Sequence, residues 1–343
     1  MIIDCSNSMW NMYIEKMPKD KRDVYFTSQY YQMEELQENG QGKMFVYEDE
    51  AGNVGIYPFI LRKINIDIVD GEYYDIESAY GYGGPLINSD DEEFATLFEK
   101  KFLEFCQDNN IVAEFVRFHP LLENHSIFKE NISVLENRTT VWLDLEKSED
   151  EIWMNEVSSQ NRNTIRKCIK NGLCVEVSTD YSEFRQIYNA TMDKVCAGDF
   201  YYFEDSYYQD ISNSEDYTLL RVVYQGETIA AAIFIGYEDY FHYHLAGSKR
   251  EFLKLSPNNI LLWEAILLGK KQGRKKMHFG GGLTNSEEDT LFRFKKKYSS
   301  TVTKFFIGKR VHNQNVYNKL IEEWEKQNGR KATLLLQYRD LCV

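Results

Sequence analysis

The chain has 343 residues, of which 43% are hydrophobic and 15% aromatic, so it can bury a large core and is not disordered. Its net charge of −14, taken over the whole chain, argues against a general nucleic-acid binder, and its length predicts about two domains. The charge is uneven: residues 1–150 have 13 basic and 30 acidic residues, a net of −17, whereas residues 151–343 have 27 and 24, a net of +3. We therefore expect an anionic ligand on the second half, although the acidic first half also suits a solubilising surface.

The sequence shows no targeting or membrane signal. The first residues, MIIDCSNSMW, have no basic region followed by a long apolar run, and the apolar stretch Ile229 to Ile235 is too short to cross a bilayer. We therefore expect a cytoplasmic protein. The six cysteines have no C-x-x-C pair and no regular spacing, which predicts reduced and mostly buried thiols.

In chain order, the first segment predicts a hairpin, a third strand, a helix and a fourth strand. The strands are predicted from alternating apolar residues, the hairpin from its turn residues, and the helix from apolar residues at helical spacing. The expected elements are strands Lys43–Glu48, Val54–Arg62 and Tyr73–Tyr80, a helix from about Asp91 to Gln107, and strand Val112–Phe118.

A second segment predicts the same succession of elements. The expected elements are strands Thr218–Tyr224, Thr228–Tyr237 and Tyr240–Leu245, helix Pro257–Gln272 and strand Lys276–Phe279. The repeated order indicates an internal duplication. Antiparallel strands that lead into a helix and a further strand resemble the central part of the GNAT fold.

A helical stretch joins the two segments. It opens with Ser148 and Glu151 in capping-box spacing and ends at Asn171-Gly172. We place the domain boundary there, which gives domains 1–147 and 148–343. The tail predicts a helix over about Asn315–Gln327 and a last strand, Ala332–Tyr338, with the option that this strand returns to the first domain.

The joining helix carries a basic stripe. Arg162, Arg166 and Lys170 lie at i, i+4 and i+8 with no interleaved acid, and Asn163 flanks them. Guanidinium groups bind phosphate oxygens bidentately, so the stripe suits a phosphate or diphosphate. A solvated basic face explains the same pattern.

The stripe belongs to RNTIRKCIKNG, which resembles the R-x-x-I-R-K-A-x-K-x-G element of FemAB-like proteins, with Cys168 where alanine is usual. Further matches follow in the order of that family, from about residue 25 to 310. They are YGYGGP at Tyr80–Pro85, RFHPLLEN at Arg117–Asn124, AGSKREFLKLSPNNILLWEAI at Ala246–Ile266, HFGGG at His278–Gly282 and LFRFKKKYS at Leu291–Ser299. The chain is therefore similar to the FemAB/FemX acyltransferases of the GNAT superfamily.

This resemblance implies an α/β (α+β) protein with two tandem GNAT-like domains, each a mixed, mostly antiparallel twisted sheet flanked by helices. It implies transfer of an aminoacyl or acetyl group onto a primary amine of a phosphate-bearing peptidoglycan or surface-polysaccharide precursor, linked to a nucleotide or a lipid. The amine attacks directly, without a covalent enzyme intermediate. Acyl-CoA or aminoacyl-tRNA is the implied co-substrate, with no tightly bound cofactor and no metal. The sequence has no heptad run, so the shorter FemX-like form fits better.

Two glycine-rich turns are expected near the substrate, because glycines let the backbone approach a ligand and present N–H groups to an anion. A tight turn closed by Pro85 explains the first of them equally well. The second follows a strand at its C-terminal edge, where ligands tend to sit. The expected substrate-binding residues are Arg162, Asn163, Arg166, Lys170, Tyr80, Tyr82, Gly83, Gly84, Gly280, Gly281 and Gly282.

The helix that starts at Pro257 is expected to face the acyl donor. Ser256 is its predicted N-cap, and in GNAT enzymes the corresponding N-terminus binds the coenzyme pyrophosphate. Ser256, Asn258 and Asn259 are therefore candidate donor-binding residues. The loop Gly247–Glu251 departs from the usual R-x-x-G-x-G/A spacing, as in FemX-like proteins, which take the acyl group from aminoacyl-tRNA.

Four residues are candidates for catalysis. Lys295 matches the lysine of the family's F-K-x-x-F/Y element, where a cation would stabilise the oxyanion of a tetrahedral intermediate. Tyr298 is a candidate proton donor by analogy with GNAT tyrosines. Glu264, on an otherwise apolar helix, is either a general base with a raised pKa or part of a structural ion pair. His244 is expected to line the site. It shares a strand face with His242, but the sequence has no third ligand at a suitable spacing, so we predict no metal site.

The central expectation is that the basic stripe and Lys295 converge on one groove of the second domain. A second hypothesis, motivated by the unusual donor loop, is a non-catalytic GNAT-fold protein that only holds a phosphorylated ligand.

Overall fold

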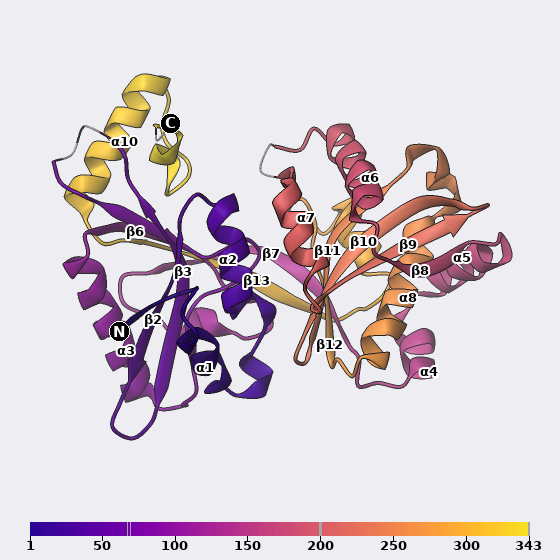
Figure 1. Cartoon of the computed structure of the whole chain (residues 1–343), viewed down its shortest axis with the longest axis horizontal. Helices are drawn as coiled ribbons and strands as arrows, with labels where there is room; N and C mark the ends of the chain where they lie inside the picture. Colours follow the sequence, from indigo (N-terminus) through magenta and orange to yellow (C-terminus); the bar gives the residue numbers. More distant parts are fainter. Residues whose placement is uncertain (67, 69, 199–200, 342–343) are drawn as a thin grey trace. The chain divides into compact units, whose positions relative to one another are not determined.

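The computed structural model describes residues 1–66, 68, 70–198 and 201–341. The chain divides into two compact units, residues 1–137 with 304–343 and residues 138–303 (Figure 1). The sequence-based division at residue 148 differs from this one. The second unit begins earlier because strand β7 (Ser133–Asp144) pairs from Thr140 to Asp144 with strand β12 (Lys276–Gly281) of the second unit.

The first unit contains a mixed sheet with the strand order β1-β2-β3-β4-β6-β13, and β5 pairs with β3. Helix α3 packs its phenylalanines on one face of this sheet. The strands are β1 (Ile2–Asp4), β2 (Gln41–Glu48), β3 (Val54–Lys63), β4 (Tyr74–Glu77), β5 (Leu86–Ile87), β6 (Ile111–Arg117) and β13 (Val302–Val311). The helices are α1 (Met9–Glu15), α2 (Ser28–Gln37), α3 (Glu92–Asp108) and α10 (Gln314–Asn328), with 3-10 turns at Lys19–Lys21, Val24–Phe26, Asn124–Ser126 and Gln337–Leu341.

The second unit contains a sheet with the order β7-β12-β11-β10-β9-β8. Its further strands are β8 (Cys174–Ser178), β9 (Tyr217–Tyr224), β10 (Glu227–Tyr237) and β11 (Tyr240–Ser248). Its helices are α4 (Glu149–Glu151), a π-helical turn (Ile152–Glu156), α5 (Ser159–Lys170), α6 (Tyr181–Lys194), α7 (Asp205–Ser212), η6 (Arg250–Leu255), α8 (Pro257–Lys271) and α9 (Thr290–Lys295).

The duplicated order of elements is confirmed at the level of strand pairing. In the first unit, β2, β3 and β4 are antiparallel neighbours, α3 follows, and β6 pairs parallel with β4. In the second unit, β9, β10 and β11 are antiparallel neighbours, α8 follows, and β12 pairs parallel with β11. Each unit therefore has the mixed, mostly antiparallel sheet that the sequence predicted.

The joining helix is interrupted, contrary to our expectation of one continuous helix. The Ser148–Glu151 capping box forms as expected. The chain then makes the π-helical turn and becomes extended at Val157 and Ser158, where the Ser158 N–H donates to the Lys297 carbonyl (2.9 Å). A new helix, α5, starts after Ser158, whose hydroxyl accepts from the Asn161 N–H. Burial of the Val157 side chain explains the break, because an extended residue carries it into the core.

The chain end differs from its sequence-based prediction. Ala332–Tyr338 does not form a strand; Tyr338 and Arg339 lie in the 3-10 turn that ends the described chain. The segment that joins the first unit is β13, which pairs antiparallel with β6, followed by α10. Tyr338 replaces strand pairing with a side-chain anchor, because its hydroxyl donates to Asp75 (3.0 Å).

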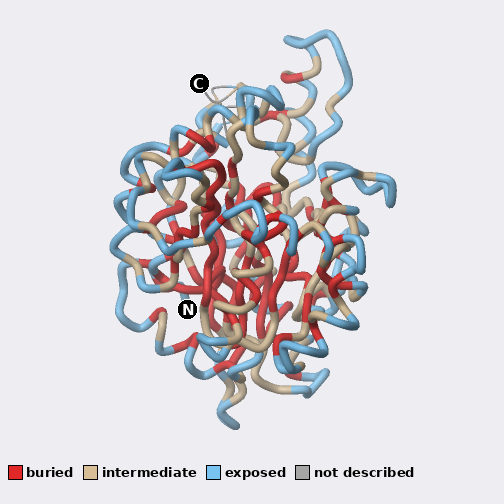
Figure 2. The backbone as a smooth tube through the Cα atoms, turned by 90° about the vertical axis from the view of Figure 1, so that its right-hand side faces the viewer, coloured by how far each residue is buried: buried red, intermediate tan, exposed pale blue. Residues whose placement is uncertain are grey.

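Each unit has its own apolar core, and buried residues concentrate in the strands (Figure 2). The first core is built mainly from phenylalanines of β2, β3 and α3. The second joins β10, β11 and β12 to α5 and α8 and includes Tyr298. Cys5, Cys106 and Cys168 are buried and Cys174 and Cys196 exposed, all as free thiols; Cys342 lies outside the described residues. Among the described helices, none is long and apolar enough to cross a membrane.

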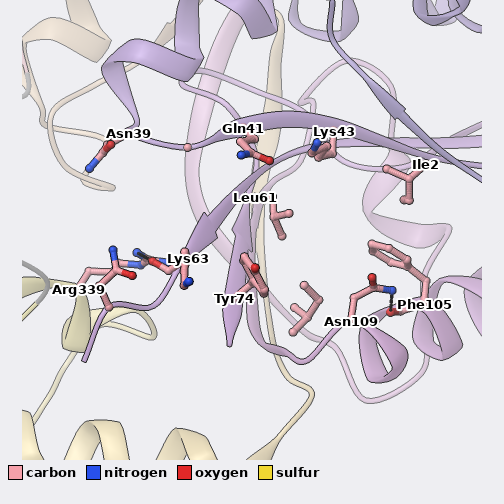
Figure 3. A pocket seen from close by; sticks show the side chains of 13 residues that line it. Ile2, Asn39, Gln41, Lys43, Leu61, Lys63, Tyr74, Phe105, Asn109 and Arg339 are labelled. Carbon is pink, nitrogen blue, oxygen red and sulfur yellow. Dashed lines mark hydrogen bonds between the residues drawn. The ribbon is translucent and has the colours of Figure 1, made fainter. Parts of the chain in front are cut away.

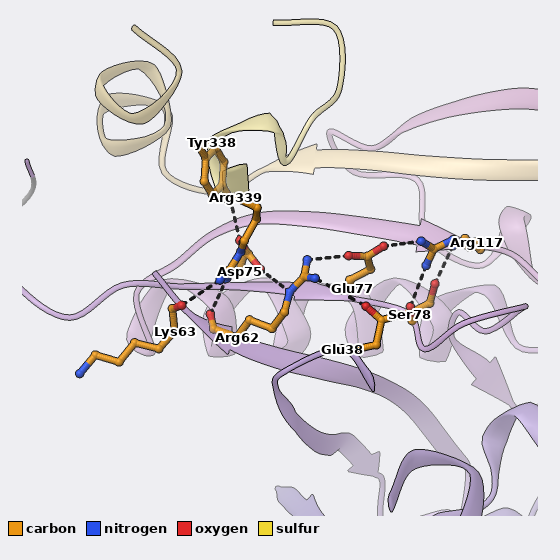
Figure 4. Close-up of polar contacts among 9 residues, drawn as sticks. All are labelled: Glu38, Arg62, Lys63, Asp75, Glu77, Ser78, Arg117, Tyr338 and Arg339. Carbon is orange, nitrogen blue, oxygen red and sulfur yellow. Dashed lines mark hydrogen bonds and ion pairs between the residues drawn. The ribbon is translucent and has the colours of Figure 1, made fainter. Parts of the chain in front are cut away.

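A network of ion pairs crosses the first unit (Figure 4). Arg62 bonds Asp75 (3.2 Å) and Glu77 (2.5 Å), and Arg117 bonds the other oxygen of Glu77 (2.5 Å). Arg339 bonds Asp75 (2.6 Å) and so ties the chain end to β4. The last turn of the described chain and strands β3, β4 and β6 are thereby held together by charge-assisted hydrogen bonds.

Glu34 on α2 adds an acid next to this network. Its side chain is 1% exposed, and one carboxylate oxygen has no hydrogen-bond partner in the described structure. Burial, and then the charge of Glu38, raise the pKa of Glu34 to about 8. The protein therefore keeps this group protonated at neutral pH.

This burial predicts a pH-dependent stability. The pKa of Glu34 is higher in the folded protein than in the unfolded chain. Its contribution to the free energy of unfolding is therefore fully present below about pH 4.5 and is lost as the pH rises through about 8. We expect Glu34→Gln to raise the free energy of unfolding at pH 8 by on the order of 2 kcal/mol and much less at pH 5. Urea unfolding at the two pH values measures this, with Glu50→Gln in the exposed β2–β3 turn as the control. An equal gain at both pH values would contradict the account.

Candidate active site in the second unit

The parallel strands β11 and β12 part in the middle of the second sheet. Their pairing runs from Tyr240 opposite Lys276 to His242 opposite His278 and ends there, although both strands continue. Each strand also has a bulge at this point. β11 inserts His244 relative to β10, and β12 inserts Phe279 relative to β7. Bulges bend a strand and end its regular pairing, so the two strands diverge from here on.

Lys295 lies where these strands diverge. Its ammonium donates to the Gly281 carbonyl at the end of β12 (2.7 Å) and lies 5.8 Å from the centre of the Tyr243 ring on β11. The side chain is only 7% exposed. Lys295 therefore contacts both strands at their point of separation, and an ammonium there has further N–H groups to offer a ligand.

Burial lowers the pKa of Lys295 to about 7. The Asp289 charge opposes this effect, whereas the Arg138 charge adds to it. Both the ammonium and the neutral amine are consequently present at neutral pH. A group with this property can stabilise developing negative charge or exchange a proton.

The second glycine turn supports this arrangement through its backbone. Gly280 has φ +78°, which favours glycine, and Gly281 supplies the carbonyl that Lys295 contacts. The Gly282 carbonyl accepts from Arg138 Nη1 (2.7 Å). A Cβ on Gly281 would lie 2.9 Å from Arg138 Cδ, so a side chain there would displace the arginine. The glycines thus serve close backbone packing beside Lys295.

The start of α8 is joined to α5 by buried amides. Asn259 Nδ2 donates to Asn161 Oδ1 (2.6 Å), and the Tyr298 hydroxyl donates to the Asn259 carbonyl (2.8 Å). Asn258 Oδ1 accepts from the Ser248 hydroxyl (3.0 Å) and so links α8 to the end of β11. Ser256 is the N-cap residue in position, but it is in the left-handed region and its side chain makes no capping bond.

Asn161 is a residue whose role we did not predict from the sequence. Its position on the apolar side of the expected helix is the signal in the sequence that distinguishes it, and the structure buries it between α5 and α8. Buried amides need partners, so a lone asparagine among apolar residues indicates a hydrogen-bonded contact.

The basic stripe and Lys295 are not brought together by the contacts of the described residues. Arg162 Nη1 donates to the carbonyls of Trp153 (3.1 Å), Met154 (3.0 Å) and Val157 (2.5 Å), so it closes the π-helical turn. Arg166 is exposed and lies 5.3 Å from the centre of the Trp153 ring. It is the Asn161 side of α5, not the stripe, that faces the segment after Lys295, through the Lys297 carbonyl. No described contact joins the stripe to Lys295, and the expected common groove stays a prediction.

The rest of the stripe faces solvent. Asn163 and Lys170 are exposed, and Asn163 accepts from Arg166 (3.2 Å). These side chains remain accessible to a large anionic partner, so their role in substrate binding stays a prediction.

His244 and Glu264 lie in different surroundings. His244 Nε2 is 2.6 Å from the Tyr207 hydroxyl, and burial lowers the pKa of His244 to about 3, so the imidazole is neutral. Glu264 is half-buried, which raises its pKa, and it lines a hollow of about 560 Å³ between β8 and α8. The lining of that hollow includes Val177 and Leu267 and none of the other three catalytic candidates.

The first glycine turn belongs to the first unit and is used internally. The Gly83 N–H donates to the Arg117 carbonyl (2.7 Å), and Asn124 donates to the Gly83 carbonyl (2.8 Å). Gly84 has φ +99°, and an added Cβ would lie 2.8 Å from the Asn124 amide. The turn thus has the structural role that we left open for it.

The neighbouring aromatic residues of this turn are likewise engaged within the unit. The Tyr80 carbonyl accepts from the Tyr30 hydroxyl (2.7 Å). The Tyr82 ring packs edge-on against Tyr25 and Phe305. A substrate contact of Tyr80 and Tyr82 stays a prediction.

A larger hollow of about 730 Å³ lies on the first unit (Figure 3). Its cations are Lys43, Lys63 and Arg339, and each is paired with a carboxylate: Asp4, Glu72 and Asp75, respectively. Since the charges are compensated, this hollow is a weaker anion site than its three cations suggest.

Comparisons with known proteins agree with the fold described above. Residues 159–296 match the family described as Acetyltransferase (GNAT) domain. The crystal structure of FemX superposes with a TM-score of 0.71 at 15% identity, covering 93% of this chain and 99% of that chain. No curated protein matches the sequence.

Two further solved structures share the fold. L-PGS from Bacillus licheniformis has a TM-score of 0.57 at 13% identity, covering 92% of this chain and 96% of that chain. The C-terminal domain of a putative lysylphosphatidylglycerol synthetase from Agrobacterium fabrum has a TM-score of 0.55 at 15% identity, covering 89% and 93%. The expected FemX-like GNAT fold is therefore confirmed.

The environment of Tyr298 generates a prediction. Its hydroxyl is fully buried and donates to the first turn of α8, and burial raises its pKa far above the usual range. We expect Tyr298→Phe to lower the free energy of unfolding by about 1 kcal/mol through the lost hydrogen bond. The transfer rate per folded molecule is expected to change less than about threefold. A loss of a hundredfold or more in that rate would instead support Tyr298 as a proton donor.

Proposed function

We propose that the second unit is an N-acyltransferase that moves an aminoacyl or acetyl group onto a primary amine of a phosphate-bearing cell-envelope precursor. The GNAT domain match at residues 159–296 and the FemX-like fold of the chain support this proposal. The observation that carries it is the position of Lys295, which contacts both β11 and β12 where the two strands part. A buried cation at such an opening suits a reaction that develops negative charge on a carbonyl oxygen.

In this reaction the acceptor amine attacks the carbonyl carbon of the acyl donor. A C–N bond forms, the carbonyl oxygen becomes an oxyanion, and the Lys295 ammonium stabilises it. The tetrahedral intermediate then collapses, the bond from carbon to the leaving oxygen or sulfur breaks, and the amine proton passes to the leaving group. The chain itself forms no covalent bond to the acyl group.

The donor is either aminoacyl-tRNA or acyl-CoA. The segment before α8 forms a 3-10 helix, Arg250–Leu255. The N-cap residue Ser256 has a left-handed backbone conformation, and its side chain makes no capping hydrogen bond. A short glycine-rich loop, which would present successive N–H groups to a pyrophosphate, does not precede α8 in the described structure. This favours aminoacyl-tRNA over acyl-CoA.

The acceptor carries phosphate in this proposal. Arg166 and Lys170 remain exposed on α5, together with Lys167 and without an acidic residue on the helix. Such a surface suits phosphate groups of a nucleotide- or lipid-linked substrate, or of tRNA. Arg162 is assigned instead to helix structure, because its guanidinium bonds three carbonyls.

Labelled donors test the function directly. The full chain is incubated with nucleotide-sugar amines and peptide amines of envelope precursors, and either with labelled aminoacyl-tRNA or with acyl-CoA. We expect label on the acceptor with aminoacyl-tRNA, abolished by RNase. Free thiol release with acyl-CoA would select the other donor. Thermal stabilisation by nucleotide sugars without transfer from either donor would favour the non-catalytic, ligand-holding alternative and overturn the transferase.

Lys295 predicts a pH dependence with a definite sign. If its cation stabilises the oxyanion, kcat/KM falls as the pH rises through about 7, where the ammonium is lost. We expect Lys295→Met to reduce kcat/KM about 100-fold or more. At pH 8.5, Lys295→Arg should be more active than Lys295→Met, because the guanidinium keeps its charge. The exposed neighbour Lys296→Met is the matched control and should leave kcat/KM within about twofold. A rate that rises through pH 7 would assign Lys295 to proton removal instead.

A further inference from the structure

One carboxylate joins the end of β12 to the start of α9. Asp289 Oδ1 accepts from the N–H groups of Leu291 (2.9 Å) and Phe292 (3.0 Å), which makes Asp289 the N-cap of α9. Its Oδ2 accepts from the N–H groups of Leu283 (3.0 Å) and Thr284 (2.9 Å) and from the Thr284 hydroxyl (3.2 Å). The two oxygens of the carboxylate therefore bind different segments.

The chain passes very close to this carboxylate. A Cβ on Gly282 would lie 2.4 Å from Asp289 Oδ1, which only glycine avoids. The preceding residue, Gly281, accepts from the Lys295 ammonium, and the Gly282 carbonyl accepts from Arg138. Two side chains thus hold the carbonyls of two consecutive glycines, and the Asp289 carboxylate packs against the second of them.

We propose that Asp289 is a positioning residue, which holds the Gly281 carbonyl and the start of α9 so that the Lys295 ammonium lies between the parted strands. The significance of this role for catalysis rests on the proposed function. Asp289 is not assigned a catalytic contact, because its oxygens are occupied by the N–H groups of residues 283, 284, 291 and 292 and by the Thr284 hydroxyl. It acts through the geometry and the charge that it gives to Lys295.

The electrostatics around Lys295 agree with this geometry. The charged groups that act on it are Asp289, which raises the pKa of Lys295, and Arg138, which lowers it; the Tyr243 ring is its neutral neighbour. Hydrogen bonds from backbone N–H groups, that of Phe292 first, lower the pKa of Asp289 to about 2. Asp289 is thus ionised throughout the working pH range.

Titration of Lys295 tests the proposal without any assay of transfer. The rate at which an amine-specific reagent labels Lys295 is followed against pH by mass spectrometry, in the full chain and in Asp289→Asn. The variant removes the charge and the acceptor for the loop N–H groups, so we expect the titration midpoint of Lys295 to fall by about one pH unit. If the proposed transferase is active, the falling limb of its kcat/KM profile shifts by the same amount.

Glu288→Gln is the matched control. Glu288 is the adjacent carboxylate, but it is exposed and bonds only the exposed Arg293 in the described structure (2.8 Å). It should leave the titration of Lys295 unchanged. A shift as large as that of Asp289→Asn would show a general charge effect and overturn the positioning role.

Asp289→Ser distinguishes the capping role of Oδ1 from the loop contacts of Oδ2, and it controls for a folding defect. Serine can still cap α9, because it is a good N-cap residue, but it has no second oxygen for the loop. We expect the same direction of shift at Lys295 and a helix content equal to that of the parent chain. An unchanged Lys295 midpoint in both folded variants overturns the inference. If Lys295→Met retains full transfer, the proposed function fails, while the titration result still decides whether Asp289 positions Lys295.

Discussion

The interruption of parallel pairing between β11 and β12 is the constraint on which the candidate site depends. Two bulges, at His244 and Phe279, end the pairing after His242 and His278. Main-chain groups that lose a neighbouring strand need other partners, and here the Gly281 carbonyl, whose residue still pairs with Thr140 of β7, accepts from the Lys295 ammonium. The gap between the strands and the position of the Lys295 ammonium therefore depend on the same hydrogen bond.

In the first unit the equivalent parallel pair, β4 and β6, does not part in this way. Its parallel strands β4 and β6 are continued by hydrogen bonds from Ser78 to the Phe115 carbonyl (3.1 Å) and from Gly83 to the Arg117 carbonyl (2.7 Å). The glycine-rich turn thus extends the pairing rather than ending it. The duplicated fold therefore has a parted strand pair in the second unit and a continued pair in the first.

Much of the fold was predictable from the sequence, because strand alternation, helical spacing and turn residues are local signals. The boundaries of β3, β10 and α8 lie within one or two residues of those expected. The strand expected at Ala332–Tyr338 was wrong, since its apolar pattern is used to anchor Tyr338 on Asp75. The motif drew attention to Lys295, and its catalytic role stays a proposal. The structural role of Arg162 could not be predicted, because the carbonyls to which its guanidinium donates come from a helix break that the sequence does not reveal. Asp289 and Asn161 act through backbone and amide partners that only the tertiary structure brings together.

Hydrogen–deuterium exchange of the full chain with and without aminoacyl-tRNA tests the central claim most directly. The claim is that the acyl donor binds where β11 and β12 part. It predicts slower exchange in peptides that contain Tyr243–Ser248 and Phe279–Gly282, with little change in Tyr80–Pro85 of the first unit. Slower exchange confined to Tyr80–Pro85, or none in either strand of the parted pair under conditions where the donor is bound, would contradict it.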